Sequence, residues 1–499
     1  MTSVFGLSLA TENTEKKKSS RYSNVAQTST EGREAMPKGR ASSPVLLFGL
    51  MVGALLAGVI TTKAAEGTGL LWGAQNEEAE RTAWYRVAKF GMFIHWGPYS
   101  VASVEASWPI MEPNIAWHIT EPEYVLLYKR FNPIQYNPAA WVELARQAGQ
   151  RYMVITTKHH DGFCMFDSAL TDYKITRTPY GNDVIAMLAK AAQESGMPLG
   201  FYYSPPDMHH PGYRDTSKLV KDTWHGDASR PEWACYLNYM EGQLRELLTK
   251  YGPVALVWFD GLDRVERYQG QRFISLIHQL QPAALVNNRI GVDGDFVTPE
   301  QEIPDRIPTR SAAENAQDAS QSRAPAPATV PPPEDFQLWE TCMTINDTWA
   351  YNKNDQHFKS VQTLIRDLAN VASKGGNFLL DVGPTPEGTI QPEFVERLQA
   401  MGEWLKVNGE SIYGTTYGPW QNLSFGKSTA KGKTIYLHVF NWPSKPELDV
   451  PALNSRVSRV TVLATGKKAH FKQKRDRVLI AVPSTPPDSN DSVLRIDTR

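Results

Sequence analysis

The stretch Val254-Ala-Leu-Val-Trp-Phe259, followed at once by Asp260 and Gly261, decides the fold expected for this chain. It is apolar at every position, so both faces of the predicted strand must be buried, as in a parallel sheet that is covered by helices. The charged Asp260 comes directly after the strand, at the edge where parallel sheets bind their ligands. We therefore predict a buried parallel strand that ends in a reactive carboxylate.

Similar apolar runs recur along the chain and alternate with helix-length amphipathic stretches. The predicted strands are residues 90–96, 152–157, 199–203, 284–287 and 377–382, and the predicted helices are residues 139–148, 184–195, 233–251, 272–280 and 361–373. This alternation predicts an α/β fold, a (β/α)8-like TIM barrel. A doubly wound open sheet is the alternative, but no glycine-rich phosphate loop opens a helix here.

A chain of 499 residues is long enough for a barrel and a smaller second domain. We assign residues 70–416 to the catalytic barrel and residues 417–499 to a C-terminal β-sandwich, because short strand-like runs separated by turn residues fill the latter. Residues 305–335 are rich in Ala, Ser, Gln and Pro, which predicts a disordered insertion on the barrel surface. A role as a lid is the alternative for this insertion.

Residues 1–65 have the composition of a leader. A polar extension precedes the apolar run 45–60, which is short for a membrane span and long enough for a signal peptide, with small residues before a cleavage point after Ala64. An uncleaved signal anchor is the alternative, and Met36 offers a more usual start than Met1. Either reading predicts export to a periplasmic or extracellular location.

Composition excludes several classes of function. The formal net charge of -1 gives no electrostatic support for nucleic-acid binding. The three cysteines cannot form a disulfide framework, and none lies in a C-x-x-C pair, so a structural zinc site is not expected. We expect no cofactor, and membrane contact only through an uncleaved leader. The oligomeric state is left open.

Polar side chains gather where the predicted strands end, which is where barrels carry their chemistry. The set comprises His95, His159, His160, Tyr202, Tyr203, Asp260, Arg289, Glu300 and Glu302. One interpretation is metal-assisted hydrolysis with His95, His159, His160 and Asp260 as ligands. The other is glycoside hydrolysis by two carboxylates. We favour the second, because adjacent strand residues such as His159 and His160 point to opposite faces unless a bulge intervenes, and because aromatic neighbours suit a sugar ring.

Several longer motifs are specific enough to compare with known families. They are Lys89-Phe-Gly-Met-Phe-Ile-His-Trp-Gly-Pro-Tyr-Ser100, Thr157-Lys-His-His-Asp-Gly-Phe163, Trp258-Phe-Asp-Gly261, Leu379-Leu-Asp-Val-Gly-Pro384 and Trp404-Leu-Lys-Val-Asn-Gly-Glu-Ser-Ile-Tyr413. Together they resemble the α-L-fucosidases of glycoside hydrolase family 29, in order, over residues 80–415. The resemblance implies a retaining exo-α-L-fucosidase that acts on a fucosylated oligosaccharide or glycoconjugate. A non-catalytic fucose-binding protein on the same fold remains an alternative.

The resemblance also implies roles for individual residues. Asp260 matches the family nucleophile, and Arg289 matches a binding arginine. Tyr203, in preference to Tyr202, is expected near the nucleophile. The remaining matches hold the sugar hydroxyls and ring, and they are His95, His159, His160 and Trp258.

The general acid/base has several candidates, because its position varies in the family. Glu300 is the preferred candidate, Glu340 is the rival, and Glu302 or Asp305 are further alternatives.

The chain departs from the family pattern at two places. It has Ser107-Trp108 where many members have a Glu-Trp pair, so Trp108 and the nearby Glu105 are expected to contact the substrate. Asp381 stands where an Asn is expected, which we interpret as altered hydrogen bonding at the barrel base.

Overall fold

The computed structural model describes residues 77–113, 117–262, 265–310 and 336–499. The predicted leader and residues 311–335 of the predicted insertion lie outside the described residues. Among the residues that are described, no helix is both long and apolar enough to cross a membrane.

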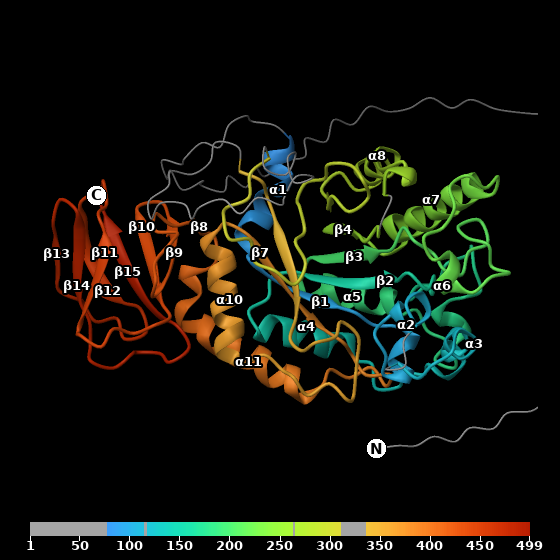
Figure 1. Cartoon of the computed structure of the whole chain (residues 1–499), viewed down its shortest axis with the longest axis horizontal. Coiled ribbons are helices and arrows are strands. Elements are labelled where there is room, and N and C mark those ends of the chain that lie inside the picture. The colour runs from blue at the N-terminus through green and yellow to red at the C-terminus, as the bar shows by residue number, and fades with distance from the viewer. Residues whose placement is uncertain (1–76, 114–116, 263–264, 311–335) are drawn as a thin grey trace, which may run out of the picture. The chain divides into compact units, whose positions relative to one another are not determined.

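Seven parallel strands form the central sheet, in the order β5-β4-β3-β2-β1-β7-β6 (Figure 1). The strands are β1 (Phe90–Ile94), β2 (Met153–Lys158), β3 (Leu199–Tyr203), β4 (Leu256–Phe259), β5 (Leu285–Val286), β6 (Glu340–Thr344) and β7 (Asn377–Val382). All are buried along their whole length, which confirms the predicted TIM-like α/β fold. The sequence patterns predicted each of these strands except β6, whose polar residues hide its burial.

Helices connect the strands and cover the sheet. They are α1 (Glu77–Ala88), α2 (Trp108–Met111), α3 (Glu121–Val125), α4 (Pro138–Gln147), α5 (Val184–Ser195), α6 (Val220–Thr223), α7 (Trp233–Lys250), α8 (Gly270–Leu280), α10 (Val361–Ser373) and α11 (Pro392–Asn408). Asn137, Asp183 and Ser360 cap α4, α5 and α10 by accepting backbone N–H bonds in the first turn. The long predicted helices are therefore confirmed.

An irregular segment, residues 295–301, joins the two edge strands of the sheet. On one side Asn287, just past β5, forms a parallel bridge with Phe296, and on the other side Val297 and Glu300 bridge to Trp339 and Cys342 at β6. The segment is too irregular to be a strand, yet it pairs with both edges. It therefore takes the place of the eighth strand and closes the barrel.

Side chains alternate between the inside of the barrel and the helical layer outside. Phe93, Tyr202, Trp258 and Leu379 belong to one buried apolar cluster inside the barrel. Their strand neighbours, such as Tyr203, pack in a separate and larger cluster beneath the helices. This alternation follows from strand geometry, and it decides which strand-end residues can reach the mouth of the barrel.

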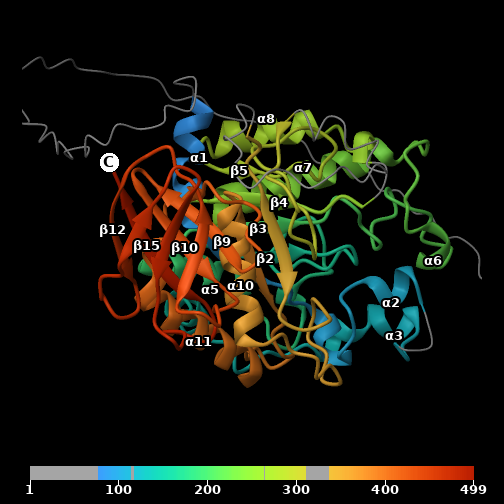
Figure 2. The ribbon, with the colours of Figure 1, turned by 60° about the vertical axis from the view of Figure 1, so that its left-hand side comes forward.

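Two antiparallel sheets follow the barrel, one of five strands in the order β12-β15-β10-β9-β8 and one of three in the order β11-β14-β13. The strands are β8 (Thr416–Tyr417), β9 (Gly426–Lys431), β10 (Thr434–Val439), β11 (Glu447–Pro451), β12 (Val457–Val462), β13 (Phe471–Gln473), β14 (Arg477–Ala481) and β15 (Ser492–Thr498). They enclose their own apolar core, as predicted for a β-sandwich. β9 contacts α10 (Figure 2), and Trp404 of α11 donates an indole N–H bond to the Asp491 carbonyl, 3.0 Å away.

The closing segment depends on a buried carboxylate, which gives a test of the fold. Asp295 accepts the backbone N–H of Val286 at 2.8 Å and pairs with Arg81 of α1. We expect Asp295→Ala to lower the free energy of unfolding by about 2–3 kcal/mol, because it leaves charged and backbone donors without an acceptor. The exposed neighbour Asp293→Asn is the matched control. Chemical denaturation measures both, and equal stabilities would contradict the role of Asp295.

Candidate active site

A pocket of about 250 Å³ lies at the carboxyl ends of the barrel strands. It is lined by most of the residues that the sequence singled out: His95, Trp108, His159, His160, Trp258, Asp260, Arg289 and Glu300. It also takes in residues that were missed or ranked lower: Phe93, Tyr202, Gly261, Leu262, Cys342 and Trp349. A polar pocket of this size with aromatic walls fits one small hydroxylated ring.

Asp260 follows β4 and is held in its ionised form. The Tyr202 hydroxyl donates to Oδ2 at 2.8 Å and Arg289 Nη1 donates to Oδ1 at 3.1 Å. Burial alone would raise the pKa of Asp260, but the charge of Arg289 and the Tyr202 hydrogen bond bring this pKa below its usual value. With 17% of the side chain exposed, Asp260 is a reachable anion.

Arg289 joins Asp260 to a second carboxylate. The same nitrogen, Nη1, that contacts Asp260 Oδ1 also donates to Glu300 Oε2 at 2.7 Å. The nearest oxygens of the two carboxylates are therefore separated by at most the sum of these two distances. The two carboxylates thus lie close together, as the paired carboxylates of a glycosidase do.

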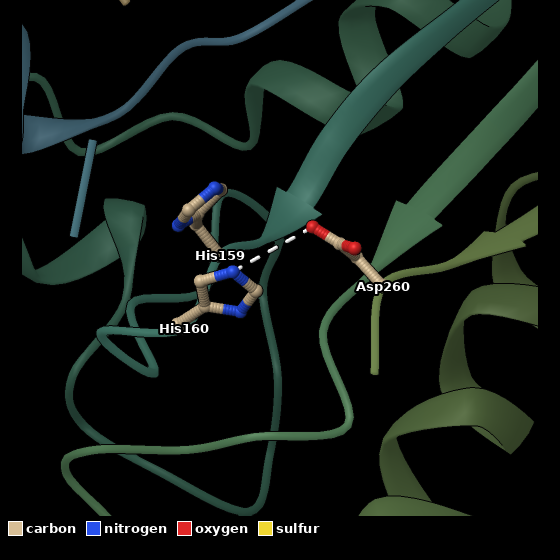
Figure 3. A group of neighbouring side chains, drawn as sticks. All are labelled: His159, His160 and Asp260. Carbon is tan, nitrogen blue, oxygen red and sulfur yellow. Dashed lines mark ion pairs between the residues drawn. The ribbon is translucent and has the colours of Figure 1, made fainter. Parts of the chain in front are cut away.

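The two adjacent histidines both turn toward this pocket, contrary to the expectation that they face opposite ways. The pairing of β2 with β3 shifts register between Thr156 and Lys158, so the side-chain alternation of β2 is interrupted before the strand ends. The rings of His159 and His160 then lie 4.2 Å apart, and His160 Nε2 is 3.6 Å from Asp260 Oδ2 (Figure 3). A bulge, the one exception that the sequence argument allowed, makes this possible.

His95 has a buried carboxylate as its hydrogen-bond partner. Its Nδ1 lies 2.7 Å from Oδ1 of Asp381, near the carboxyl end of β7. Burial alone would lower the pKa of His95, but the adjacent Asp381 raises it. Burial also raises the pKa of Asp381, to about 6. The interpretation of Asp381 as a barrel-base residue was therefore wrong, because this side chain orients a histidine of the pocket.

Glu105 does not line the pocket. It is buried, and both its carboxylate oxygens accept the backbone N–H of Trp349 at 3.1 Å. Burial raises the pKa of Glu105 to about 8. Glu105 therefore holds a pocket tryptophan in place, and the expected direct contact with substrate is not supported by this geometry.

Strand alternation also corrects the choice of tyrosine. Tyr203 points out of the barrel, where its hydroxyl donates to Gln243 of α7 at 2.8 Å. Tyr202 points inward and contacts Asp260. The preference for Tyr203 was wrong, and the period-two rule applied to Trp258 and Asp260 would have favoured Tyr202.

Among the acid/base candidates, only Glu300 reaches the pocket. Glu340 lies inside the barrel, where it accepts bonds from Trp258 Nε1 at 3.0 Å and from the hydroxyls of Tyr85 and Tyr152. Burial raises the pKa of Glu340 to about 7, yet its oxygens are engaged by these donors and it is fully enclosed. Glu302 and Asp305 are exposed and do not line the pocket.

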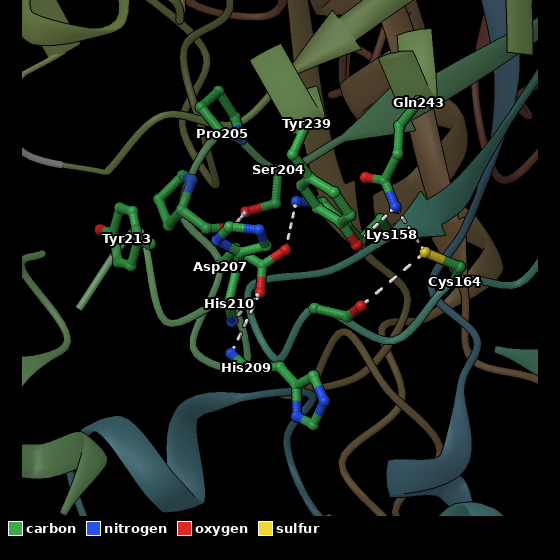
Figure 4. Close-up of polar contacts among 12 residues, drawn as sticks. Lys158, Cys164, Ser204, Pro205, Asp207, His209, His210, Tyr213, Tyr239 and Gln243 are labelled. Carbon is green, nitrogen blue, oxygen red and sulfur yellow. Dashed lines mark hydrogen bonds and ion pairs between the residues drawn. The ribbon is translucent and has the colours of Figure 1, made fainter. Parts of the chain in front are cut away.

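A buried ion pair fixes the loop after β3 next to His160. Lys158 Nζ lies 2.9 Å from Asp207 Oδ2, and both side chains are almost fully enclosed (Figure 4). Asp207 Oδ1 in turn accepts the backbone N–H groups of His209 and His210. The pair therefore ties the end of β2 to the loop that carries Ser204.

Trp349 is the pocket residue that sequence reasoning missed most completely. It lies in the loop after β6, 5.1 Å between ring centroids from His95. The only available signal was the position of this loop after a strand that was itself not recognised. Cys342, on β6, was considered only for disulfides and for a zinc site, and all three cysteines are free.

The site also bears on the metal-dependent alternative. Ligand atoms of His159, His160 and Asp260 all lie within 4.8 Å of one another. However, Arg289 already places a fixed positive charge 3.1 Å from Asp260, where a divalent cation would be repelled. The cluster suits hydrogen bonding to hydroxyl groups better than cation binding.

A barrel with paired carboxylates, histidines and aromatic walls at its mouth defines a glycoside hydrolase. Residues 61–410 match the profile of the family described as alpha-L-fucosidase, and the chain belongs to this family. The chain is 29% identical over 439 residues to the tissue alpha-L-fucosidase of Bos taurus, which covers 81% of this chain and 85% of the relative.

Solved structures agree with the family. Alpha-L-fucosidase isoenzyme 1 from Paenibacillus thiaminolyticus has a TM-score of 0.75 and 32% identity, over 85% of this chain and 100% of that chain. A family 29 alpha-L-fucosidase from Bacteroides thetaiotaomicron has a TM-score of 0.71 and 25% identity, over 86% of this chain and 99% of that chain. The latter is a trapped covalent intermediate in complex with 2-fluoro-fucosyl fluoride, obtained with a Glu-to-Gln mutant. The predicted α-L-fucosidase is thus confirmed at the level of family and activity.

The tyrosine assignment can be tested by the acid limb of the pH profile of kcat/KM, which we expect to report the ionisation of Asp260 in the free enzyme. Removing the Tyr202 hydroxyl in Tyr202→Phe removes a bond that favours the carboxylate. We therefore expect the acid limb to move to higher pH and kcat/KM to fall about tenfold. Tyr203→Phe is the matched control and should leave the acid limb in place. A shift in Tyr203→Phe alone would reverse the assignment.

Proposed function

We propose that this α-L-fucosidase is a retaining exo-enzyme, with Asp260 as nucleophile and Glu300 as general acid/base, that removes terminal α-L-fucosyl residues from oligosaccharides or glycoconjugates. The observation that carries the proposal is the single Arg289 nitrogen that contacts both carboxylates. It holds the two carboxylates close together, which supports a double displacement. The small volume of the pocket supports recognition of one terminal sugar.

In the first step, an oxygen of Asp260 attacks the anomeric carbon while Glu300 donates a proton to the leaving oxygen. The glycosidic C–O bond breaks, and a fucosyl ester on Asp260 forms. The proton can lie on Glu300 Oε1 while Oε2 accepts from Arg289. Such an ester is consistent with the covalent intermediate trapped in the Bacteroides thetaiotaomicron relative.

In the second step, Glu300 takes a proton from water and the water oxygen attacks the same carbon. The ester C–O bond breaks, Asp260 returns as a carboxylate, and fucose leaves with its original anomeric configuration. The 43% exposure of the Glu300 side chain supports both roles, because a leaving group and a water molecule can reach it.

Substitution of each carboxylate separates their roles. We expect Asp260→Gly to lower kcat on an aryl α-L-fucoside by more than roughly 10³-fold, and Glu300→Ala to lower it by about 10²–10⁴-fold on a substrate with a poor leaving group. Added azide should give the inverted β-fucosyl azide with Asp260→Gly and the retained α-fucosyl azide with Glu300→Ala. NMR of the products distinguishes the two. The control Glu302→Ala should behave as wild type.

Two results would oppose these assignments. Normal turnover of a poor-leaving-group substrate by Glu300→Ala would exclude Glu300 as the acid. A first-formed product with β configuration from the wild-type enzyme would exclude retention.

We also propose that the enzyme is exported, on the basis of the leader composition alone. If residues 1–64 act as a cleaved signal, the mature protein should begin at Ala65 and be recovered outside the cytoplasm. N-terminal sequencing of the fractionated protein measures this. A variant that lacks residues 36–64 is the control and should stay inside. An intact N-terminus on cytoplasmic wild-type protein would refute the proposal.

A further inference from the structure

We infer that Ser107 and Ser204 hold the adjacent pocket histidines, His159 and His160, as opposite neutral tautomers. His159 then presents an N–H donor to the pocket and His160 presents a bare nitrogen acceptor. The two serines are positioning residues. The inference deepens the proposed function, on which it rests for the identity of the ligand, a hydroxyl of the sugar.

The tautomer of His160 follows from the direction of a hydrogen-bond chain. His160 Nδ1 lies 2.6 Å from Ser204 Oγ, and Ser204 Oγ lies 2.7 Å from the carbonyl oxygen of Pro206. A carbonyl can only accept, so the serine proton is directed to Pro206. The Nδ1 atom must then carry a proton and donate to Ser204. In a neutral imidazole this leaves Nε2 without a proton.

The same hydrogen-bond argument gives the opposite tautomer at His159. Its Nδ1 lies 2.6 Å from Ser107 Oγ, which already accepts the backbone N–H of Asp161 at 2.9 Å. Ser107 is fully buried, and among the bonds of the described residues His159 Nδ1 is the acceptor that its proton can reach. Ser107 therefore donates to Nδ1, and Nε2 of His159 carries the ring proton.

Both rings are neutral, as the argument requires. Burial lowers the pKa of His159 well below its usual value, helped by the proximity of His160 and His95. Burial likewise lowers the pKa of His160, to about 4, despite the opposing effect of Asp260. At neutral pH each ring therefore has one donor and one acceptor nitrogen.

The chemical consequence lies at Asp260. His160 Nε2 and Asp260 Oδ2 are 3.6 Å apart, and both are acceptors. Neither can donate to the other, so each remains available to a proton from the ligand. His159, 4.2 Å away between ring centroids, supplies the complementary donor. This pattern selects hydroxyl groups, which donate and accept at once, over fluorine, which only accepts.

The serines act from different loops, which makes them separable by mutation. Ser107 precedes α2 after β1, and Ser204 follows β3. In Ser204→Ala the partner of Nδ1 is lost, and His160 is free to place its proton on Nε2 and donate to Asp260. The acceptor offered to the sugar then disappears, although the ring itself is unchanged.

The direct test is ¹⁵N NMR of the histidine-labelled enzyme in its free form. Signals are assigned by their loss in His159→Gln and His160→Gln. We expect the Nε2–H form at His159 and the Nδ1–H form at His160, with Ser204→Ala converting His160 alone. The same tautomer at both positions, or an unchanged His160 in Ser204→Ala, would overturn the inference. The wild-type spectrum decides the matter even if the variant does not fold.

Kinetics supply a second readout, with monodeoxy and monofluoro aryl α-L-fucosides as probes. We expect Ser204→Ala to lower kcat/KM about 10-fold to 100-fold. In Ser204→Ala, the ratio of kcat/KM for the hydroxyl substrate to kcat/KM for the fluoro substrate, at the most sensitive ring position, should fall toward one. Ser204→Thr, which keeps a hydroxyl, should restore this ratio. An unchanged preference in a folded Ser204→Ala enzyme would count against the inference.

A matched control distinguishes this effect from the loss of any buried serine. Ser411 is also buried and donates to a backbone carbonyl, that of Asn408, at 2.6 Å. Ser411→Ala should change neither the preference nor the NMR signals. Opposite tautomers in an enzyme that is inactive on α-L-fucosides would support this inference while refuting the proposed function.

Discussion

Neighbouring side chains on a strand point to opposite sides of a sheet, and the pocket of this fucosidase depends on that constraint. Trp258 on β4 and Asp260 just after it share the inner side of the sheet with Tyr202 on β3, so a carboxylate, an aromatic wall and a hydroxyl donor converge. The residues between them face the helices and build the outer core. At the end of β2 the alternation is broken, and the break brings His159 and His160 together. A local irregularity in β2 therefore lets two adjacent histidines line the same pocket.

The charged side chains of the barrel lie at different depths. Arg289 stands between Asp260 and Glu300 and stacks over the Trp258 ring, with the guanidinium 4.8 Å from the ring centroid. Deeper inside, Glu340 accepts the Trp258 indole N–H and so fixes that ring from below. The most buried acids act on side chains of the pocket, and the more exposed ones are left to react.

The sequence was sufficient for the barrel because buried parallel strands are apolar throughout, and for Asp260 because a carboxylate after such a strand stands out. The sequence was insufficient where a polar side chain is buried. β6 begins with Glu340, which looks like a surface residue until Tyr85, Tyr152 and Trp258 are seen to satisfy it. Because this strand was not predicted, Trp349 in the loop after it was not recognised as a pocket residue. The choice of Tyr203 over Tyr202 was a different kind of error, because the period-two rule was available and was not applied.

The irregular segment that replaces the eighth strand has a consequence for how the enzyme can change over evolutionary time. The same few residues seal the barrel and carry Glu300, whereas Asp260 and the histidines directly follow strands of the sheet. New leaving-group preferences can therefore arise by remodelling one short piece of chain without disturbing sugar recognition. That freedom is limited, because any remodelled version must still bridge both sheet edges, so change at Glu300 is coupled to the integrity of the whole barrel.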